Sequence, residues 1–232
     1  MAKSGKLIVL DGQDGTGKAT QTKLLIARLR KEGIKAETLD FPGYERTVFG
    51  KLIGECLVGK HGNFVSTDPY IASTLYAADR FESKAQIEGW LSVGKTVILD
   101  RYVSSNQMHQ GGKLKSPTQR RVFLNWLDCM EHGVFGLPRP DAIIYLSMPV
   151  SVSLKLLRNK DQKLKKAYTK GGIDQTENDI KYLENARKSA MRILEENGSW
   201  KKIHCAPRGQ LLSKEDIHDL IFKEIQNIVH KK

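Results

Sequence analysis

The sequence predicts a three-layer α/β/α fold with a mostly parallel central sheet. Apolar runs of strand length alternate with segments of helical length along the chain, which is typical of such sheets. The run 96–100 is almost continuously apolar, as expected for a parallel strand that helices cover on both faces. A glycine-rich loop follows the first apolar run and leads into a helical pattern, so strand, loop and helix are joined as one unit.

The elements can be assigned in order from these patterns. Strands are expected at about 6–11, 34–41, 96–100, 141–146 and 200–205. Helices are expected at about 17–32, 47–58, 68–93, 116–132, 151–160, 174–196 and 213–229. The polar, lysine-rich stretch 161–172 is interpreted as a mobile flap. With no internal repeat or linker in view, we expect a single domain spanning 1–232, with a lid at roughly 158–174.

Composition limits the classes of function. The formal net charge of +12 suits polyanionic partners, either nucleotides or nucleic acid, although many of the lysines are expected to be simply solvated. The cysteines are few and far apart, so we expect neither a zinc site nor a disulfide framework; they are Cys56, Cys129 and Cys205. We see no secretory leader and no apolar run long enough to span a membrane, and we expect a cytoplasmic protein.

The glycine-rich loop is the first candidate site. Its Gly-x-x-x-x-Gly-Lys pattern between strand and helix is typical of a phosphate cradle, in which backbone N–H groups converge on an anion. The lysine adds a mobile charge for the outer phosphates, and the helix dipole adds to the field. We expect ATP to bind Gly12, Gln13, Asp14, Gly15, Thr16, Gly17, Lys18, Ala19 and Thr20.

The second candidate site follows the buried strand at 96–100. Because ligands gather at the carboxyl ends of parallel strands, the pair Asp100-Arg101 is expected beside the glycine loop. Asp100 lies where a carboxylate could hold Mg²⁺, and its alternative role is to cap a helix. The planar guanidinium of Arg101 suits a group that bridges two phosphates, and its alternative role is a surface ion pair.

These residues, with others farther along, resemble the thymidylate kinases, which are P-loop NTPases of the nucleoside monophosphate kinase type. The resemblance runs from about residue 6 to residue 220, and the combination of motifs is specific where the loop alone is not. It rests on Asp14, Phe41-Pro42, the run Tyr76 to Glu82, Asp100-Arg101-Tyr102 with Ser105 and Gln110-Gly111, and Pro138-x-Pro140-Asp141. It implies transfer of the γ-phosphate of ATP to dTMP with Mg²⁺, giving dTDP for dTTP synthesis, by a homodimer that has no membrane or nucleic-acid partner.

The resemblance also implies roles for single residues. Lys18, Arg101 and Asp14 are expected to be catalytic, and a third cation, Arg158 or a flap lysine, is expected to assist. Arg208 is expected near the adenine of ATP, and Asp100 near Mg²⁺ through a water molecule. In the acceptor site, we expect dTMP to contact Asp14, Phe41, Pro42, Tyr76, Arg80, Arg101, Ser105, His109 and Gln110.

The sequence departs from the family pattern at three positions, and Gly15 resembles one of two arrangements within the family. Ala19 replaces the usual Ser or Thr that binds Mg²⁺, and Gly15 stands where some members carry a catalytic Arg. Asp40 stands where many members carry an Arg for the dTMP phosphate, and Arg46 or Lys51 could bind that phosphate instead. His109 replaces an aromatic residue near the sugar. Discrimination against ribonucleotides is therefore left open.

Three alternatives remain at the level of sequence. One is a kinase for another acceptor, such as dUMP, AMP or a deoxynucleoside, or one of broad specificity. Another is a phosphate-loop protein that binds nucleic acid, which the net charge of +12 favours but no recognised binding motif supports. The third is a non-catalytic nucleotide binder, because Ala19 removes a metal ligand.

Overall fold

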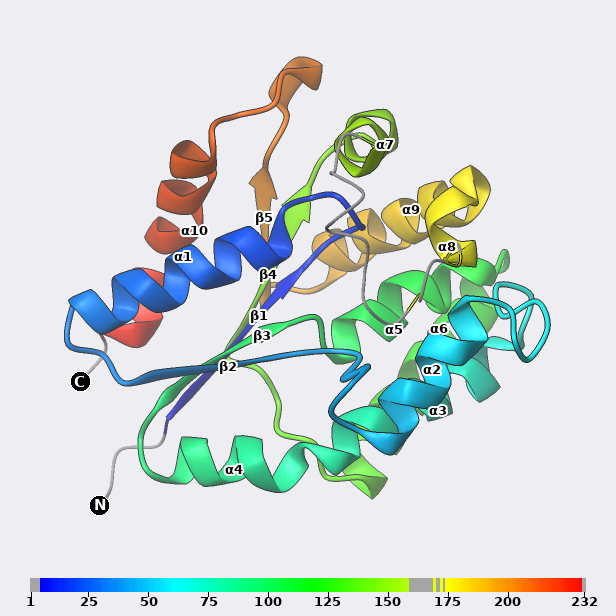
Figure 1. Ribbon diagram of the computed structural model, residues 1–232, viewed down its shortest axis with the longest axis horizontal. Helices are drawn as coiled ribbons and strands as arrows, with labels where there is room; N and C mark the ends of the chain where they lie inside the picture. Colours follow the sequence, from blue (N-terminus) through cyan, green and yellow to red (C-terminus); the bar gives the residue numbers. More distant parts are fainter. Residues whose placement is uncertain (1–4, 159–168, 170–171, 173, 231–232) are drawn as a thin grey trace.

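A single parallel sheet organises the protein in the computed structural model, which describes residues 5–158, 169, 172 and 174–230 (Figure 1). Its strands in these residues are β1 (Lys6–Asp11), β2 (Ala36–Asp40), β3 (Thr96–Asp100), β4 (Ala142–Ser147) and β5 (Trp200–His204). Their spatial order is β2-β3-β1-β4-β5, and every pairing is parallel. The predicted fold class is therefore confirmed, and all the carboxyl ends lie along one edge of the sheet.

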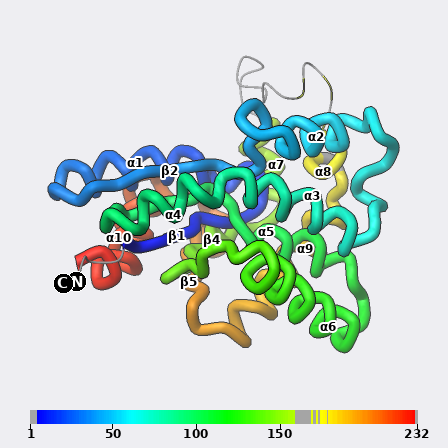
Figure 2. The backbone as a smooth tube through the Cα atoms, turned by 90° about the horizontal axis from the view of Figure 1, so that it is seen from below, coloured from blue at the N-terminus to red at the C-terminus, as the bar shows by residue number. Residues whose placement is uncertain are grey.

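Side chains alternate between the two faces of the sheet along each strand, so the core has one layer on each face. Ile8 and Leu10 face one side, where they pack against α1 (Lys18–Lys31) and α10 (Lys214–Val229). Leu7 and Val9 face the other side, which is covered by α4 (Lys84–Ser92), α5 (Val103–His109), α6 (Pro117–Asp128) and α9 (Ile180–Glu196). In Figure 1, α1 and α10 lie above the sheet and α4 lies below it; Figure 2 shows α4 in front of the strands. Because successive side chains of a strand point to opposite faces of the sheet, both faces of the sheet are buried.

The remaining helices surround the carboxyl edge of the sheet. After β2 come α2 (Val48–Leu57) and α3 (Pro69–Glu82), which share a small apolar cluster that includes Ile53 and Ala72. After β4 come α7 (Val150–Arg158) and the short α8 (Gln175–Asn178), and α7 packs against α9 through Val150 and Leu183. No helix among the described residues combines the length and apolar character that a membrane crossing needs.

Four helix predictions need correction. The helix expected over 68–93 is two helices, because the Ser83 N–H turns back to the carbonyl of Arg80 and separates α3 from α4. The helix expected over 174–196 is also two, because Asp179 caps α9 through its side chain. The α-helix expected to reach residue 132 ends at Asp128, and the chain continues as a short π-helix, Cys129–Val134. Helix α5 was not predicted; it is short, and its packing on α9 stabilises it.

Candidate active site

The phosphate loop, residues 12–18, follows β1 directly. Glycines 12, 15 and 17 have positive φ angles of 149°, 82° and 87°, a conformation that glycine adopts without steric cost. Helix α1 begins at Lys18 after Gly17, and no side chain caps its first turn. Its N–H groups and the positive end of its dipole are therefore suited to an anion. Ala19 and Thr20 lie exposed in this first turn.

The side chain of Lys18 folds back over the loop. Its Nζ donates to the carbonyls of Gly12 and Gln13, both at 2.9 Å, and only 7% of the residue is exposed. Burial, followed by the nearby charge of Arg101, lowers the pKa of Lys18 to about 8. The ammonium is therefore held on the loop and predominantly charged at neutral pH, as a ligand for phosphate must be.

Gly15 is confined by helix α7. A Cβ added at this position would overlap the carbonyl oxygen of Ser153 and crowd the side chain of Leu157. The loop therefore has no room for the arginine that some relatives carry there. Arg158 lies exposed at the last position of the same helix. The lid expected at 158–174 falls mostly outside the described residues, and so do its lysines.

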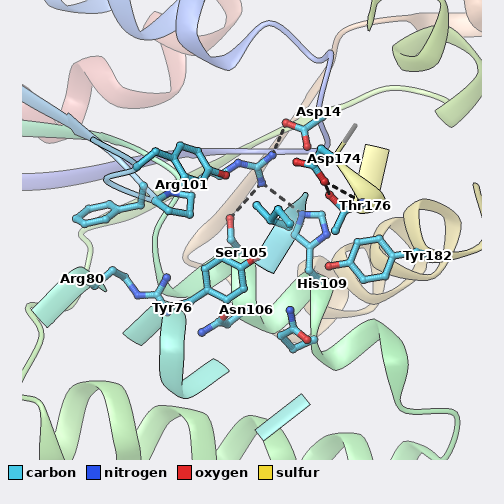
Figure 3. A pocket seen from close by; sticks show the side chains of 15 residues that line it. Asp14, Tyr76, Arg80, Arg101, Ser105, Asn106, His109, Asp174, Thr176 and Tyr182 are labelled. Atoms are coloured by element: carbon cyan, nitrogen blue, oxygen red, sulfur yellow. Dashed lines mark hydrogen bonds and ion pairs between the residues drawn. The ribbon is translucent and has the colours of Figure 1, made fainter. Parts of the chain in front are cut away.

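A pocket opens where β1, β2 and β3 end (Figure 3). We call it the acceptor pocket, after the role that the sequence predicts for residues in its lining. It encloses about 550 Å³, part of it open to solvent, which is within the range of small-ligand sites. All the residues predicted to contact dTMP line it: Asp14, Phe41, Pro42, Tyr76, Arg80, Arg101, Ser105, His109 and Gln110. Its remaining lining residues are Tyr44, Leu57, Asn106, Asp174, Thr176 and Tyr182.

Arg101 occupies the end of the pocket next to the phosphate loop. One terminal nitrogen donates to Asp14 Oδ1 at 2.8 Å, and the other lies 3.4 Å from Ser105 Oγ and 3.3 Å from His109 Nε2. Burial disfavours its charge, but the carboxylates of Asp14 and Asp11 outweigh this effect and raise the pKa of Arg101. The guanidinium stays charged and is held from two sides, which suits a group that must meet developing negative charge.

Arg80 and Tyr76 form the opposite end, one helical turn apart on α3. Arg80 is only 2% exposed; it pairs through Nε and a terminal nitrogen with Glu131 at 2.7 and 2.6 Å. Its other terminal nitrogen donates to the carbonyl of Tyr102 at 3.3 Å. These three bonds leave two of the five guanidinium N–H groups without a partner among the described residues. The partner of Arg80 is therefore Glu131, which is 51 residues away along the chain.

His109 is neutral in this site. Its Nε2 faces an arginine nitrogen, which can only donate, so Nε2 accepts and the proton lies on Nδ1. Burial and the charge of Arg101 lower the pKa of His109 to about 3. The ring stacks on Tyr182 with centroids 5.5 Å apart. His109 Nδ1 and Gln110 Oε1 are buried without a hydrogen-bond partner among the described residues, so both are open to a ligand.

The buried carboxylate of Asp79 holds the segment after β2 that lines the pocket. Asp79 on α3 accepts bonds from the Gly43 N–H at 3.2 Å and from the Thr47 hydroxyl. These bonds anchor the turn that follows the cis peptide Phe41–Pro42. Arg46 lies outside the pocket lining and pairs with Asp40 at 3.1 Å, so its charge is directed at that carboxylate.

The sequence missed several pocket residues. Asn106 could have been found, because it lies four residues before Gln110 on one helical face. Asp174 is the last residue of the expected lid, and Thr176 and Tyr182 follow it. All three are far along the chain from every motif, and only the folding of α8 and α9 onto the pocket brings them there. Glu131 does not line the pocket, but it pairs with Arg80. It gave no signal either, because it belongs to a π-helix that the sequence does not mark.

Other predicted site residues lie outside the pocket. Asp100 ends β3, and Lys18 and Arg101 both act on its carboxyl group. Burial is the largest influence on that group and raises the pKa of Asp100. Arg208 is exposed in the turn Pro207–Gly209 after β5, with a left-handed φ of 52°. Both are at the carboxyl edge of the sheet, where ATP is expected.

Comparison with known proteins assigns this arrangement to a family. The family model described as thymidylate kinase matches residues 10–217, which include the phosphate loop and every residue of the acceptor pocket. The chain belongs to the thymidylate kinase family. It is therefore a nucleoside monophosphate kinase.

Individual thymidylate kinases support the assignment. The enzyme of Mycobacterium tuberculosis is 32% identical over 68% of this chain and 72% of its own length. That of Schizosaccharomyces pombe is 30% identical over 97% of this chain and 93% of its own, and the human enzyme is 35% identical over 66% of each. The solved thymidylate kinase structure of Candida albicans shares the fold, with a TM-score of 0.74 and 21% identity over 98% of this chain and 94% of its own.

Proposed function

We infer that this protein phosphorylates dTMP to dTDP, with ATP as the donor. The observation that carries the inference is one pocket, next to a phosphate loop, lined by all the residues expected to contact dTMP. An oxygen of the dTMP phosphate attacks the γ-phosphorus of ATP, the bond to the bridging oxygen breaks, and ADP leaves. Such a transfer needs positioning and charge neutralisation more than covalent catalysis.

The acceptor is proposed to lie with its phosphate toward Arg101 and its base toward Tyr76 and Arg80. Arg101 neutralises charge on the acceptor phosphate and on the group in transfer, while Asp14 accepts from a sugar hydroxyl. The remaining N–H groups of Arg80 suit the O4 acceptor of thymine, and Tyr76 supplies an aromatic face. Cytosine presents an amine at that position, which would meet the guanidinium donor to donor.

The donor is proposed to lie on the other side of the loop. The loop amides and Lys18 hold the ATP phosphates, and Arg208 approaches the adenine. Arg158, on the helix that closes against Gly15, or a lysine in 160–170 supplies a further cation. Single alanine replacements across 158–170 test this last step. If none lowers kcat by about tenfold, the cation comes from elsewhere.

The residues present fit Mg²⁺ held largely by the substrate. The described residues contain no group of three or more His, Cys, Asp or Glu side chains that could hold a metal alone. Ala19 offers no hydroxyl, but Asp100 presents a carboxylate beside the loop lysine. Such a set suits an ion that keeps several waters and takes most ligands from phosphates. When bound, Mg²⁺ would neutralise the β- and γ-phosphates, and Asp100 would hold one of its waters.

Three further proposals concern the whole chain. It is one domain that works as a homodimer, and the exposed apolar side chains of α2, α3 and α6 support a contact there; they include Val48, Ile71, Phe81 and Val122. It works in the cytoplasm, which the free thiols of Cys56, Cys129 and Cys205 suit. Cell fractionation tests the location, and limited proteolysis that releases no separately folded fragment supports one domain.

A coupled assay for ADP release tests the proposed function. We expect turnover with dTMP and ATP in the presence of Mg²⁺, and little turnover after chelation. Parallel reactions with dUMP, dCMP, AMP and thymidine measure the selectivity of the pocket. If another acceptor is turned over faster than dTMP, that acceptor is the preferred substrate. No turnover of any acceptor, together with tight salt-sensitive DNA binding, would favour the nucleic-acid alternative.

A further inference from the structure

Asp11 is a fully buried carboxylate that the proposed transfer leaves without a role. It is the last residue of β1, and none of its surface is exposed. Its oxygens accept from the Gly12 N–H at 2.8 Å and from the Ser104 hydroxyl at 2.5 Å, and the Ser105 hydroxyl lies within 3.0 Å of both. Burying a charge is costly unless its bonds compensate, so this group needs a reason to be where it is.

The bonds of Asp11 lead to Arg101. A serine hydroxyl has one hydrogen, and an ionised carboxylate can only accept, so Ser105 donates to Asp11. The oxygen of Ser105 then has a lone pair for the arginine nitrogen 3.4 Å away. The same nitrogen lies 3.8 Å from Asp11 Oδ1. Asp11 therefore acts on the guanidinium directly by charge and indirectly through Ser105.

The backbone of Arg101 also needs support. Its φ of 68° is in the left-handed region, which is uncommon for residues other than glycine and costs free energy. Such a conformation persists only where the surroundings enforce it. Its N–H donates to the Leu10 carbonyl at 2.9 Å, so the residue before Asp11 holds the backbone while Asp11 holds the side chain.

We propose that Asp11 is the positioning residue for Arg101. It aims the guanidinium into the acceptor pocket and ties the first turn of α5 to the end of β1. It touches neither nucleotide and acts through Arg101, so the proposal rests on the proposed kinase function. Because preorganised charge matters most for the group in transfer, loss of Asp11 lowers kcat more than it raises either KM.

Three variants separate positioning from simple structure. Asp11→Asn keeps the size of the side chain and removes its charge; we expect kcat to fall by about tenfold or more, with both KM values within about twofold. Ser105→Ala breaks the bridge to Arg101 and lowers kcat by about threefold or more. Ser104→Ala is the matched control, because it removes an equal hydroxyl from the same carboxylate without touching Arg101. It keeps kcat within about twofold.

A double-mutant cycle with Arg101→Lys completes the test. Lysine lacks the fork that Ser105 and Asp14 hold, so adding Asp11→Asn to it lowers kcat by less than about twofold. Equal factors in both backgrounds overturn the positioning role and leave the kinase function intact. Equal loss in the Ser104 and Ser105 variants overturns it as well, even where Asp11→Asn fails to fold. A wild-type protein that phosphorylates no monophosphate overturns both proposals.

Discussion

The protonation states of single residues in this site are set by burial and by neighbouring charges. Lys18, His109 and Arg101 lie in one small region, yet burial lowers the pKa of the first two, while carboxylates raise that of the third. Each is thereby held in one protonation state at neutral pH, with Lys18 and Arg101 charged and His109 neutral. The charged state of Lys18 leads to a first test at the residue scale, and the buried pair of Arg80 and Glu131 to a second.

The pKa of Lys18 near 8 predicts how ATP affinity depends on pH. Only the ammonium binds phosphate well, and this group loses its proton as pH rises through that value. We expect the KM for ATP to be flat below about pH 7.5 and to rise toward about pH 9, by up to roughly tenfold per unit. Steady-state kinetics across this range measure it. Lys18→Arg is the control, because arginine stays charged and its profile should remain flat; a rise in both enzymes would assign the titration to another group.

The Arg80–Glu131 pair is predicted to matter for both folding and acceptor binding. Glu131 has no exposed surface and also accepts from Asn106 at 2.9 Å, so Glu131→Gln leaves a buried guanidinium without its counter-charge. We expect the free energy of unfolding to fall by about 3 kcal/mol and the KM for dTMP to rise. Denaturant unfolding and kinetics measure the two effects.

The matched control is the exposed pair Arg139–Asp128, which has similar distances of 2.6 and 2.7 Å. Asp128→Asn should cost no more than about 1 kcal/mol, because water already solvates both groups. If the two variants lose equal stability, burial of the Glu131 pair is not the source of its effect.

At the scale of elements, the site depends on how helices end and meet. Helix α1 begins at the phosphate loop, α5 begins just after Arg101, and α7 closes over Gly15. The positions of α1 and α7 could be predicted, because each follows a strand in a chain where strands and helices alternate. The break between α8 and α9 could not be predicted, because Asp179 becomes the cap of α9 only once α9 packs on the sheet. That packing brings Asp174 and Thr176 into the pocket.

The contact between the phosphate loop and α7 predicts a sharp response to a single methyl group. Gly15→Ala places a β-carbon at positive φ and against the Ser153 carbonyl, so the loop and α7 must separate. We expect a several-fold rise in the KM for ATP and a lower Tm, at a cost of about 1–3 kcal/mol. Gly89→Ala, in open space on α4, is the control and should be neutral or stabilising. Unchanged ATP kinetics in Gly15→Ala would contradict this account of the loop.

At the scale of the molecule, one sheet edge gathers groups from most of the chain. The acceptor pocket takes residues from the segments after β1, β2 and β3 and from α3, α5, α8 and α9. The net charge of +12 suits two anionic substrates that meet there. The charge does not explain the exposed apolar side chains on α2, α3 and α6.

Those side chains lead to the prediction of a dimer. We expect light scattering to give twice the chain mass of 26.1 kDa. Ile71→Asp, on α3 and 61% exposed, should weaken the dimer, whereas Val93→Asp, 66% exposed at the end of α4, should not. A monomer in the wild-type protein, or equal dissociation in both variants, would show that this face has another role.

The sequence by itself determined the parallel sheet, the phosphate loop and part of the lining of the acceptor pocket, such as Tyr76, Arg80 and Arg101. Those features follow from local periodicity, from glycine spacing and from motifs whose order places them at one edge of the sheet. Only the tertiary structure decided that Arg80 pairs with Glu131, that α7 leaves no space at Gly15, and that Asp11 is buried behind Arg101. These contacts join residues distant along the chain. Their free energies depend on burial and on which polar groups meet, and neither can be seen until the layers close.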